Sequence, residues 1–530
     1  MIGVVELFVG LLLVVVILAL LARRFHVPYP IFFVIGGTVL GFLPGLPSVR
    51  LSPDLVFLVV LPPLLFPAAL FTSWRDFREN LRPILLLAIG LVLFTTTAVA
   101  FLAHSFLHLP LAAGFVLGAI VSPPDAIAAT AIAERLSVPS RIVTILAGES
   151  LVNDATALVA YRLAIVGVAT GTFSWTHATG QFFLIALGGI LTGLAAGWLA
   201  EQFHRRVDDA PIEITFSLLT AFAAYLIAER LQVSGVLSVV TAGLYLGWRA
   251  PEITSFRTRL HGGPVWEMLE FVLNGLVFLL IGLQLPRILA RLARDQMPTH
   301  QVIAYAVLIT GAIIVLRLLW VLPSVYLPRL IFKHYCRHDP RPPWQHVVIV
   351  GWTGMRGVVS LAAALALPVT IADGTPFPGR DLILFLTFVV IFATLVLQGL
   401  SLPYLIRYLG VEDDGLAEKE ERDARLLANR SALEQLTELA SPDATGHEAA
   451  VRLRVEYEDQ ILQLQSKADD ATGGSLRLFS AEYERLSREA LQVERRTILR
   501  LRNDGAINDN VLRRIQRDID LAEARLQHHG

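Results

Sequence analysis

Long apolar runs that lack any charged side chain fill most of the first 410 residues of this 530-residue chain. A run of about 18 or more apolar residues is long enough to cross the hydrocarbon core of a bilayer as a helix. Inside the bilayer the backbone must satisfy its own hydrogen bonds, which a helix does within one segment. The runs therefore predict an all-α, polytopic membrane protein.

The apolar runs predict about thirteen spans when broken helices are allowed. The loops after odd-numbered spans carry 16 Lys or Arg residues, whereas the loops after even-numbered spans carry 6. Because positive charge favours the cytoplasmic side, the N-terminus is expected outside and the C-terminus in the cytoplasm. The predicted spans centre near residues 13, 38, 63, 93, 122, 154, 192, 220, 241, 275, 313, 355 and 393.

The last 120 residues differ in composition from the rest of the chain. Of the 44 basic and 45 acidic residues in the chain, 18 and 25 lie in residues 411–530. Within this tail, residues 475–503 and 509–527 place apolar side chains at helical spacing among many charges. We expect a membrane domain over residues 1–410 and a soluble, helical cytoplasmic tail over 411–530.

Several classes of protein lack support in the sequence. None of the three lysines, Lys333, Lys419 and Lys467, follows the glycine of a Walker A motif, which argues against an ATP-driven pump. The chain has one cysteine and no HExxH pair, so a cysteine-rich metal site or an intramembrane metalloprotease is not indicated. We expect no enzymatic activity and no cofactor.

The sixth predicted span, which contains "GESLVNDATALV", carries a polar face. Glu149 and Asn153 are four residues apart, and so are Ser150 and Asp154, so all four fall on one side of a helix. Helix-to-helix hydrogen bonding would explain Ser150 and Asn153 but explains two carboxylates poorly. Ionisable groups at this depth usually pair or border a wet cavity, which makes Asp154 a candidate functional residue.

The fifth and twelfth predicted spans carry helix-breaking sequences. In "SPPDAIAA", Pro123 and Pro124 cannot donate backbone hydrogen bonds, so the helix should break immediately before Asp125. In "GWTGMRGVV", glycines that include Gly354 surround Arg356 and permit close crossing or local unwinding. Each span is the middle member of a group of three, so we expect two inverted repeats that cross at a midplane site.

The eleventh predicted span places Arg317 at the same expected depth as Glu149. A bidentate pair would satisfy both charges and would be structural. It would leave Asp125 and Asp154 as carboxylates that hold either a proton or a dehydrated monovalent cation, and competition for their oxygens would couple the two ions. Arg162, near the outer end of its span, is expected to reach toward the interface.

Four segments together resemble the electroneutral branch of the cation:proton antiporters, the bacterial NhaP-type Na+/H+ antiporters and their relatives, the animal Na+/H+ exchangers. The resemblance covers roughly residues 1–410 and implies a homodimer in the bacterial cytoplasmic membrane. It also implies a core of spans near 82–169 and 302–406 that moves against dimerisation spans near 4–72 and 182–285. The segments are "SPPDAIAA", "GESLVNDATALV", "FVLNGLVFLLIGLQLP" and "GWTGMRGVVSLAAALALP".

The resemblance also implies roles for individual residues. Asp154 matches the family's ion- and proton-binding aspartate, and its neighbour Asn153 is an aspartate in the electrogenic branch, which suggests exchange of one cation for one proton. The other matches are Asp125 with the aspartate of the unwound span, Ser150 with a cation ligand, Glu149 and Arg317 with the ion pair, and Arg356 with a second core arginine.

One position departs from the family pattern. Many relatives read Thr-Asp-Pro at the crossing, whereas this chain reads Pro124-Asp125-Ala126 and lacks the threonine hydroxyl. Na+ at Asp154 and Asp125 is the expected cargo, with Li+ or K+ as alternatives, and lipid is the only other partner expected besides a second copy; no nucleic acid is expected. A sodium-coupled solute symporter and a cation channel remain open, although no selectivity-filter motif is present.

Overall fold

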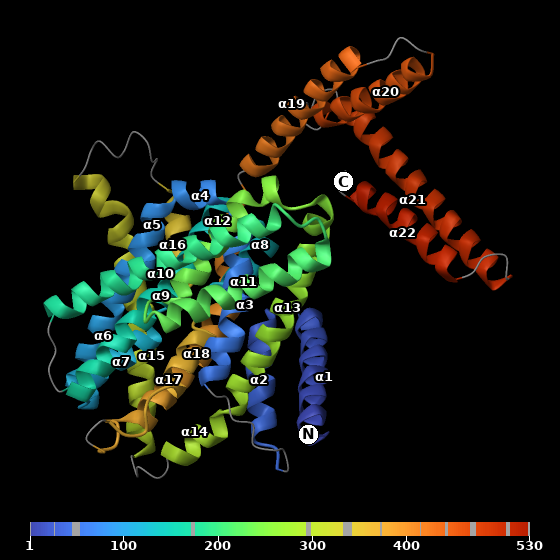
Figure 1. The fold of residues 1–530 in the computed structure, drawn as a ribbon. Coiled ribbons are helices and arrows are strands. Elements are labelled where there is room, and N and C mark those ends of the chain that lie inside the picture. The colour runs from blue at the N-terminus through green and yellow to red at the C-terminus, as the bar shows by residue number, and fades with distance from the viewer. Residues whose placement is uncertain are drawn as a thin grey trace. The chain divides into compact units, whose positions relative to one another are not determined.

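The structure is a computed structural model that describes residues 2–25, 27–44, 53–170, 175–292, 298–331, 342–371, 374–413, 415–439, 444–466, 473–504 and 509–527 (Figure 1). These residues form helices and connecting loops, with one isolated β-bridge between Thr370 and Pro376. The chain divides into two compact units, Met1–Asp413 and Asp414–Gly530. The predicted all-helical architecture is confirmed for the described residues.

The first unit is a bundle of apolar helices. Among the described residues, eight helices are long and apolar enough to cross a membrane, and shorter apolar helices lie between them. Every predicted span centre falls on a helix or on the break between two half-helices, while the number thirteen stays a prediction. In chain order the elements are α1 (Ile2–Phe25), α2 (Tyr29–Gly41), η1 (Leu55–Val60), α3 (Leu61–Leu70), α4 (Trp74–Glu79), α5 (Leu81–Leu85), η2 (Leu86–Leu91), α6 (Val92–Leu107), α7 (Leu111–Val121), α8 (Ile127–Arg135), α9 (Ser140–Thr170), α10 (Trp175–His204), α11 (Ala210–Arg230), α12 (Gly235–Ile253), α13 (Phe256–Leu283), α14 (Leu285–Leu292), α15 (Thr299–Ile331), α16 (Trp344–Trp352), α17 (Val358–Leu365) and α18 (Arg380–Leu409).

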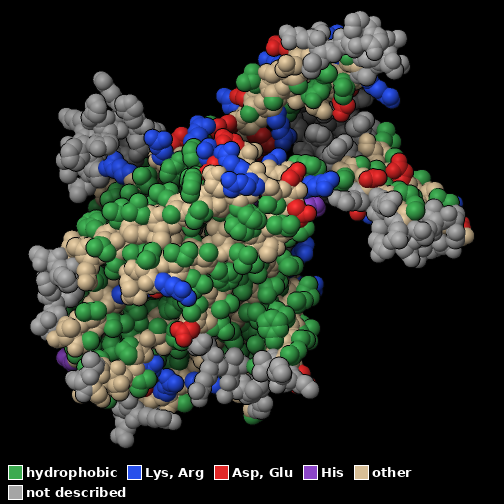
Figure 2. Space-filling view, in the orientation of Figure 1, with side chains coloured by type: hydrophobic (Ala, Val, Ile, Leu, Met, Phe, Trp, Pro, Cys, Tyr) green, Lys and Arg blue, Asp and Glu red, His purple; other side chains and the backbone are tan. Residues whose placement is uncertain are grey.

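The outer surface of this unit is apolar, as a membrane protein requires. Figure 2 shows hydrophobic side chains over most of the visible face of the bundle, while Lys and Arg side chains concentrate toward the end that carries α4. Large hydrophobic side chains such as Phe183, Leu184 and Leu219 are more than half exposed. Exposing so much apolar surface to water is unfavourable, so contact with lipid explains it.

Two of the predicted spans are broken near their middle. Helix α7 ends at Val121 and α8 begins at Ile127; helix α16 ends at Trp352 and α17 begins at Val358. The first break contains the adjacent prolines, which lack the donors that a helix needs. The second contains glycines, which weaken a helix through their conformational freedom. The predicted interruptions in both spans are confirmed.

The helices pack into groups around separate hydrophobic cores. One core joins residues of α6, α7, α9, α15, α17 and α18, and another joins residues of α3, α11, α12 and the middle of α9. Helix α10 packs along α12, and α2 packs along α13. Helix α9 therefore contacts both groups, which places its polar residues near their boundary.

The second unit consists of four helices, α19 (Leu416–Leu439), α20 (Ala444–Ser466), α21 (Gly473–Asn503) and α22 (Asp509–Gln527). The last two pack through Ile498, Leu512 and Ile519. Arg495 of α21 reaches Asp520 and Glu523 of α22 at 2.7 and 2.6 Å. The helices predicted at 475–503 and 509–527 are confirmed.

Candidate functional site

The two broken helices meet at their unwound segments, residues 122–126 and 353–357. The backbone N–H of Asp125 donates to the carbonyl of Met355 at 2.6 Å. In an unbroken helix this N–H would donate to the carbonyl of Val121, four residues earlier. It donates instead to the other broken helix, so a backbone hydrogen bond joins the two unwound segments.

Arg356 donates hydrogen bonds to carbonyl groups that lack a helical donor because the two helices are broken. Its Nε donates to the carbonyl of Val121 at 3.0 Å, one of its terminal nitrogens donates to the carbonyl of Gly354, and its backbone N–H donates to Thr394 Oγ1 at 3.1 Å. The side chain is only 1% exposed. A buried guanidinium needs such partners, so Arg356 cross-links the crossing where the helical hydrogen bonds are missing.

The hydroxyl of Ser122 compensates for part of the proline break. It donates to the carbonyl of Ala119 at 3.2 Å, an acceptor that loses its helical donor because residue 123 is proline. The hydroxyl of Thr96 donates to the same Ser122 oxygen at 3.2 Å. The break is thus supported by its own Ser122 and by Thr96 of α6, as unwound backbone inside a membrane requires.

Gly357 allows the close approach of the two segments. A Cβ atom at this position would overlap the carboxylate of Asp125, which lies directly against the glycine. Because glycine has no side chain, the backbone of one broken helix can reach the acidic side chain of the other. Any larger residue would have to displace Asp125.

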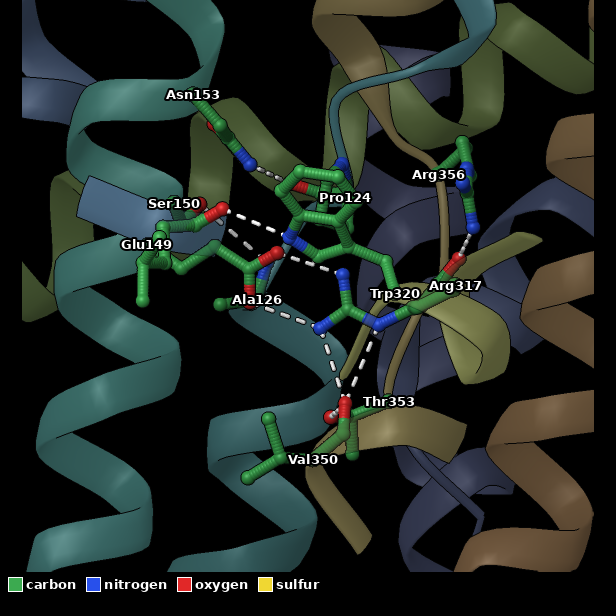
Figure 3. A network of polar contacts seen from close by, with 12 residues as sticks. Pro124, Ala126, Glu149, Ser150, Asn153, Arg317, Trp320, Val350, Thr353 and Arg356 are labelled. Carbon is green, nitrogen blue, oxygen red and sulfur yellow. Dashed lines mark hydrogen bonds and ion pairs between the residues drawn. The ribbon is translucent and has the colours of Figure 1, made fainter. Parts of the chain in front are cut away.

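The polar face of α9 holds the first broken helix in place (Figure 3). The amide of Asn153 donates to the carbonyl of Pro124 at 2.6 Å, and the hydroxyl of Ser150 accepts from the backbone N–H of Ala126 at 3.4 Å. Both side chains therefore contact backbone on the two sides of Asp125. The side-chain oxygen of Asn153 is buried and has no partner among the described residues.

Glu149 and Arg317 form the ion pair that the sequence led us to expect. Two terminal nitrogens of Arg317 donate to the two oxygens of Glu149 at 2.6 and 2.8 Å, and both side chains are almost fully buried. Arg317 also donates from Nε and one terminal nitrogen to the carbonyl of Val350 at 3.2 and 3.1 Å (Figure 3). This geometry satisfies both charges inside the protein.

A cavity of about 130 Å³ lies beside the crossing, and both remaining carboxylates line it. Asp125 accepts from the backbone N–H of Ile127 at 2.9 Å, whereas Asp154 has no hydrogen-bond partner among the described residues although it is only 8% exposed. The hydroxyls of Ser150 and Ser360 line the same cavity. Carboxylate and hydroxyl oxygens are ligands suited to hard monovalent cations and to protons.

The structure divides the ten predicted residues between the cavity and its support. Pro123, Asp125, Ser150 and Asp154 line the cavity, whereas Glu149, Asn153, Arg317 and Arg356 hold the surrounding helices, with Pro124 and Gly354 supplying carbonyl acceptors. Sequence reasoning missed the buried Ser360, whose hydroxyl has no partner among the described residues. Its position three residues after Gly357, at the start of a half-helix, was the available signal.

Arg162 of α9 forms an ion pair with a neighbouring helix. One of its terminal nitrogens donates to both oxygens of Glu229 on α11, at 2.7 and 2.8 Å. Both side chains remain partly exposed. That Arg162 reaches the membrane interface stays a prediction, and its partner could not be predicted because depth along one helix does not reveal which side chain of a neighbouring helix lies opposite.

Comparison with known proteins agrees with this geometry. Residues 10–408 match the family described as sodium/hydrogen exchanger, transmembrane. The chain is 35% identical to an uncharacterized Na+/H+ exchanger of Mycobacterium tuberculosis, with 98% of this chain and 95% of that protein covered. It is also 35% identical to the sodium, potassium, lithium and rubidium/H+ antiporter of Bacillus pumilus, with 86% of this chain and 69% of that protein covered.

A solved structure shares the fold. The sodium proton antiporter MjNhaP1 of Methanocaldococcus jannaschii superposes with a TM-score of 0.61 at 20% identity, covering 77% of this chain and 98% of the other. At this identity the likeness concerns the fold alone, whereas the family match and the two relatives extend over most of the sequence. The chain is therefore a membrane-spanning member of the sodium/hydrogen exchanger family of antiporters.

Proposed function

We propose that this protein exchanges Na+ for H+ across the bacterial cytoplasmic membrane, one for one, with both ions binding at Asp154 and Asp125. The observation that carries the proposal is the cavity at the crossing of two broken helices, which contains two carboxylates and no compensating basic side chain in its lining. A cation between these oxygens disfavours protonation, and a proton disfavours the cation. Each ion therefore leaves when the other arrives, and the exchange is coupled.

Electroneutral exchange is supported by the residues around the cavity, whose charges stay the same throughout the transport cycle. Glu149 is neutralised by Arg317, and Asn153 contributes an amide where a carboxylate would add another charge. The cavity then alternates between holding one Na+ and holding one additional proton, and its total charge is the same in both states. This balance supports a stoichiometry of one cation for one proton.

The position of the cavity along α9 supports alternating access. Its lining on α9 runs from Ala147 to Asp154 and includes no later residue of this helix. In the predicted topology α9 begins on the cytoplasmic side, so the cavity extends from the carboxylates toward the cytoplasm. Beyond Asp154, the pair between Arg162 and Glu229 joins α9 to α11. In our proposal this conformation faces inward, and movement of the core against the dimerisation helices exposes the site outside.

The proposal includes the assembly and the tail. A homodimer, an outer N-terminus and a cytoplasmic helical tail follow from the family resemblance and the distribution of arginines. For the cargo, Na+ is the first choice and Li+ or K+ the alternatives, because the related antiporter of Bacillus pumilus is named for sodium, potassium, lithium and rubidium. With Pro124 in place of a threonine, the hydroxyls of Ser150 and Ser360 become the side-chain ligands that complement the two aspartates.

Two other functions were open from the sequence. A symporter of an organic solute would need a larger site, because pockets for small molecules typically measure about 300–1,000 Å³. The cavity of about 130 Å³ fits a partly hydrated cation better. A channel would need a continuous pore, whereas the buried crossing is cross-linked by Asp125, Met355 and Arg356.

The test is a flux measurement on purified protein in proteoliposomes. With a pH-sensitive dye inside and the membrane potential clamped, NaCl, LiCl, KCl or choline chloride is added outside. The wild type should show a proton flux that depends on the cation, and Asp154→Asn, which keeps the shape of the side chain, should abolish it. A flux that needs an added solute would favour the symporter, and a cation current without proton flux would favour the channel.

A further inference from the structure

A second cavity, with a volume of about 580 Å³, lies within the membrane unit away from the crossing. Its walls come from the loop between α3 and α4, the end of α10, the beginning of α11, the end of α12 and the beginning of α13. None of its lining residues belongs to the cavity at Asp154. It is therefore a separate space in the other group of helices.

Glu213 is the unusual residue in this second cavity. The side chain lines the cavity and is 0% exposed, and neither carboxylate oxygen has a hydrogen-bond partner among the described residues. A buried carboxylate without a partner is unfavourable, so an unpaired one inside a cavity points to something that pairs with it. It lies in the first turn of α11.

The nearby basic groups are engaged elsewhere. Arg75 donates to Glu79 at 3.1 Å, and Arg259 donates to the carbonyl of Thr254. The Nδ1 atom of the buried His204 lies 3.0 Å from the carbonyl of Ala200 in its own helix. These contacts leave Glu213 without an ion pair in the described part of the protein, so its carboxyl group is available to pair with a cationic ligand.

The shape and lining of the cavity define the ligand class. Trp74, Trp248 and Trp266 line it together with aliphatic side chains, and Glu213 is the only carboxylate among the lining residues. A metal ion would need several oxygen ligands and far less space. An organic cation fits better, since its ammonium group can pair with the carboxylate and its body can pack against the indole rings.

The three tryptophans differ in how far they are exposed. Trp74 and Trp248 are 40% and 54% exposed, whereas Trp266 is 3% exposed. The lining thus combines two partly exposed indole rings with a buried one, and the carboxyl group of Glu213 is buried as well. We propose that this cavity binds an amphiphilic primary ammonium ion, with its amine on Glu213 and its apolar body against the tryptophans.

The experiment uses the purified full-length protein and 2-phenylethylammonium chloride as the probe. Binding is followed by tryptophan fluorescence and by titration calorimetry, in saturating NaCl so that the cavity at Asp154 is occupied. The wild type should bind one equivalent, and 2-phenylethanol, which has the same body without the charge, should bind far more weakly. Glu213→Gln, which keeps the shape, should weaken amine binding on the order of 10- to 100-fold.

Two further variants make the result decisive. Glu252 is an exposed glutamate on α12 that pairs with Arg249, so Glu252→Gln should leave the affinity unchanged. Gly262 lines the cavity, and a Cβ atom there would meet only Ile214, at 4.0 Å. Gly262→Leu therefore fills space while keeping Glu213, and it should also weaken binding.

Three outcomes would overturn the proposal. The first is an affinity that does not change in a folded Glu213→Gln variant, and the second is the absence of saturable binding to the wild type. The third is a loss of binding in Asp154→Asn with Glu213 intact, which would place the amine in the transport cavity. Thermal unfolding of each variant shows whether it is folded, and Gly262→Leu tests the cavity if Glu213→Gln does not fold.

Discussion

Helix α9 carries two buried acidic residues, Glu149 and Asp154, whose surroundings differ completely. Glu149 meets the guanidinium of Arg317 through two hydrogen bonds and is closed off from the cavity. Asp154, little more than one turn along the helix, has no hydrogen-bond partner among the described residues and lines the cavity. One carboxylate is part of the framework, and the other is available to an exchangeable ion.

This difference shows what a charge inside a membrane helix can be used for. Removing a charge from water costs several kcal/mol, and a bidentate pair recovers much of that cost only if both partners stay in place. A carboxylate that lines a cavity can recover it with a proton or a cation instead, and can then release that ion.

The largest effect is expected from breaking the buried pair. Glu149→Gln leaves Arg317 buried without its counter-charge, which should lower the free energy of unfolding by about 3–5 kcal/mol. The loss is measured by thermal or denaturant unfolding in detergent. The matched control is the double variant Glu149→Gln with Arg317→Met, which removes both charges and should recover part of the loss. Equal stability of the wild type and the single variant would contradict a structural role for the pair.

A large effect on transport is expected at Gly357. Gly357→Ala introduces a methyl group where Asp125 lies, so the carboxylate must move. Displacing a ligand by about 1 Å can cost on the order of 100-fold in rate, and we expect the exchange rate to fall by that order. The control is Gly311→Ala on α15, where a Cβ atom meets nothing within 4 Å. If both variants exchange ions at the wild-type rate, Asp125 is not a ligand.

A moderate effect is expected from the hydroxyls in the cavity. Ser150→Ala and Ser360→Ala each remove one oxygen that can face the cation, and one such contact contributes about 1 kcal/mol. The KM for Na+ should rise roughly fivefold in each variant, while protein stability changes little. Concentration-dependent flux in proteoliposomes gives the KM. An unchanged KM in both variants would show that the aspartates bind the cation without them.

The smallest effect on stability is expected at the partly exposed pair between Arg162 and Glu229. Its nitrogen–oxygen distances of 2.7 and 2.8 Å are close to those of the buried pair, but exposed pairs contribute only about 0–1 kcal/mol. Arg162→Gln should therefore lower the free energy of unfolding by less than 1 kcal/mol, compared with several for Glu149→Gln. Parallel unfolding curves of the two variants make the comparison. A loss as large as that at Glu149 would show that burial does not decide the contribution of these pairs.

Much of the site could be predicted because its residues conflict with their surroundings. Adjacent prolines cannot continue a helix, so Pro123 and Pro124 marked the break from sequence alone. An arginine in an apolar span must find an acid at a similar depth, which led to the pairing of Arg317 with Glu149. In each case the cost of burying an unsatisfied group left few alternatives.

The remaining contacts depend on how the helices are rotated about their axes. The hydrogen bond from Asp125 to Met355, the contact of Arg356 with Val121 and the unpartnered hydroxyl of Ser360 involve groups that are unremarkable in the sequence. The pairing of Arg162 with Glu229 depends on the same rotation. Spacing along one helix gives the face of a residue but not the residue that faces it across the interface.

We propose that Na+ and H+ compete for Asp154 and Asp125. Measuring proton release when the cation binds tests this competition most directly. Purified protein in weakly buffered solution is titrated with NaCl while a pH indicator and a calorimeter record proton release and binding together. We predict that each Na+ bound releases a proton, and that Asp154→Asn abolishes both signals while remaining folded. Saturable Na+ binding without proton release in the wild type would contradict the account, because the two ions would then occupy different sites.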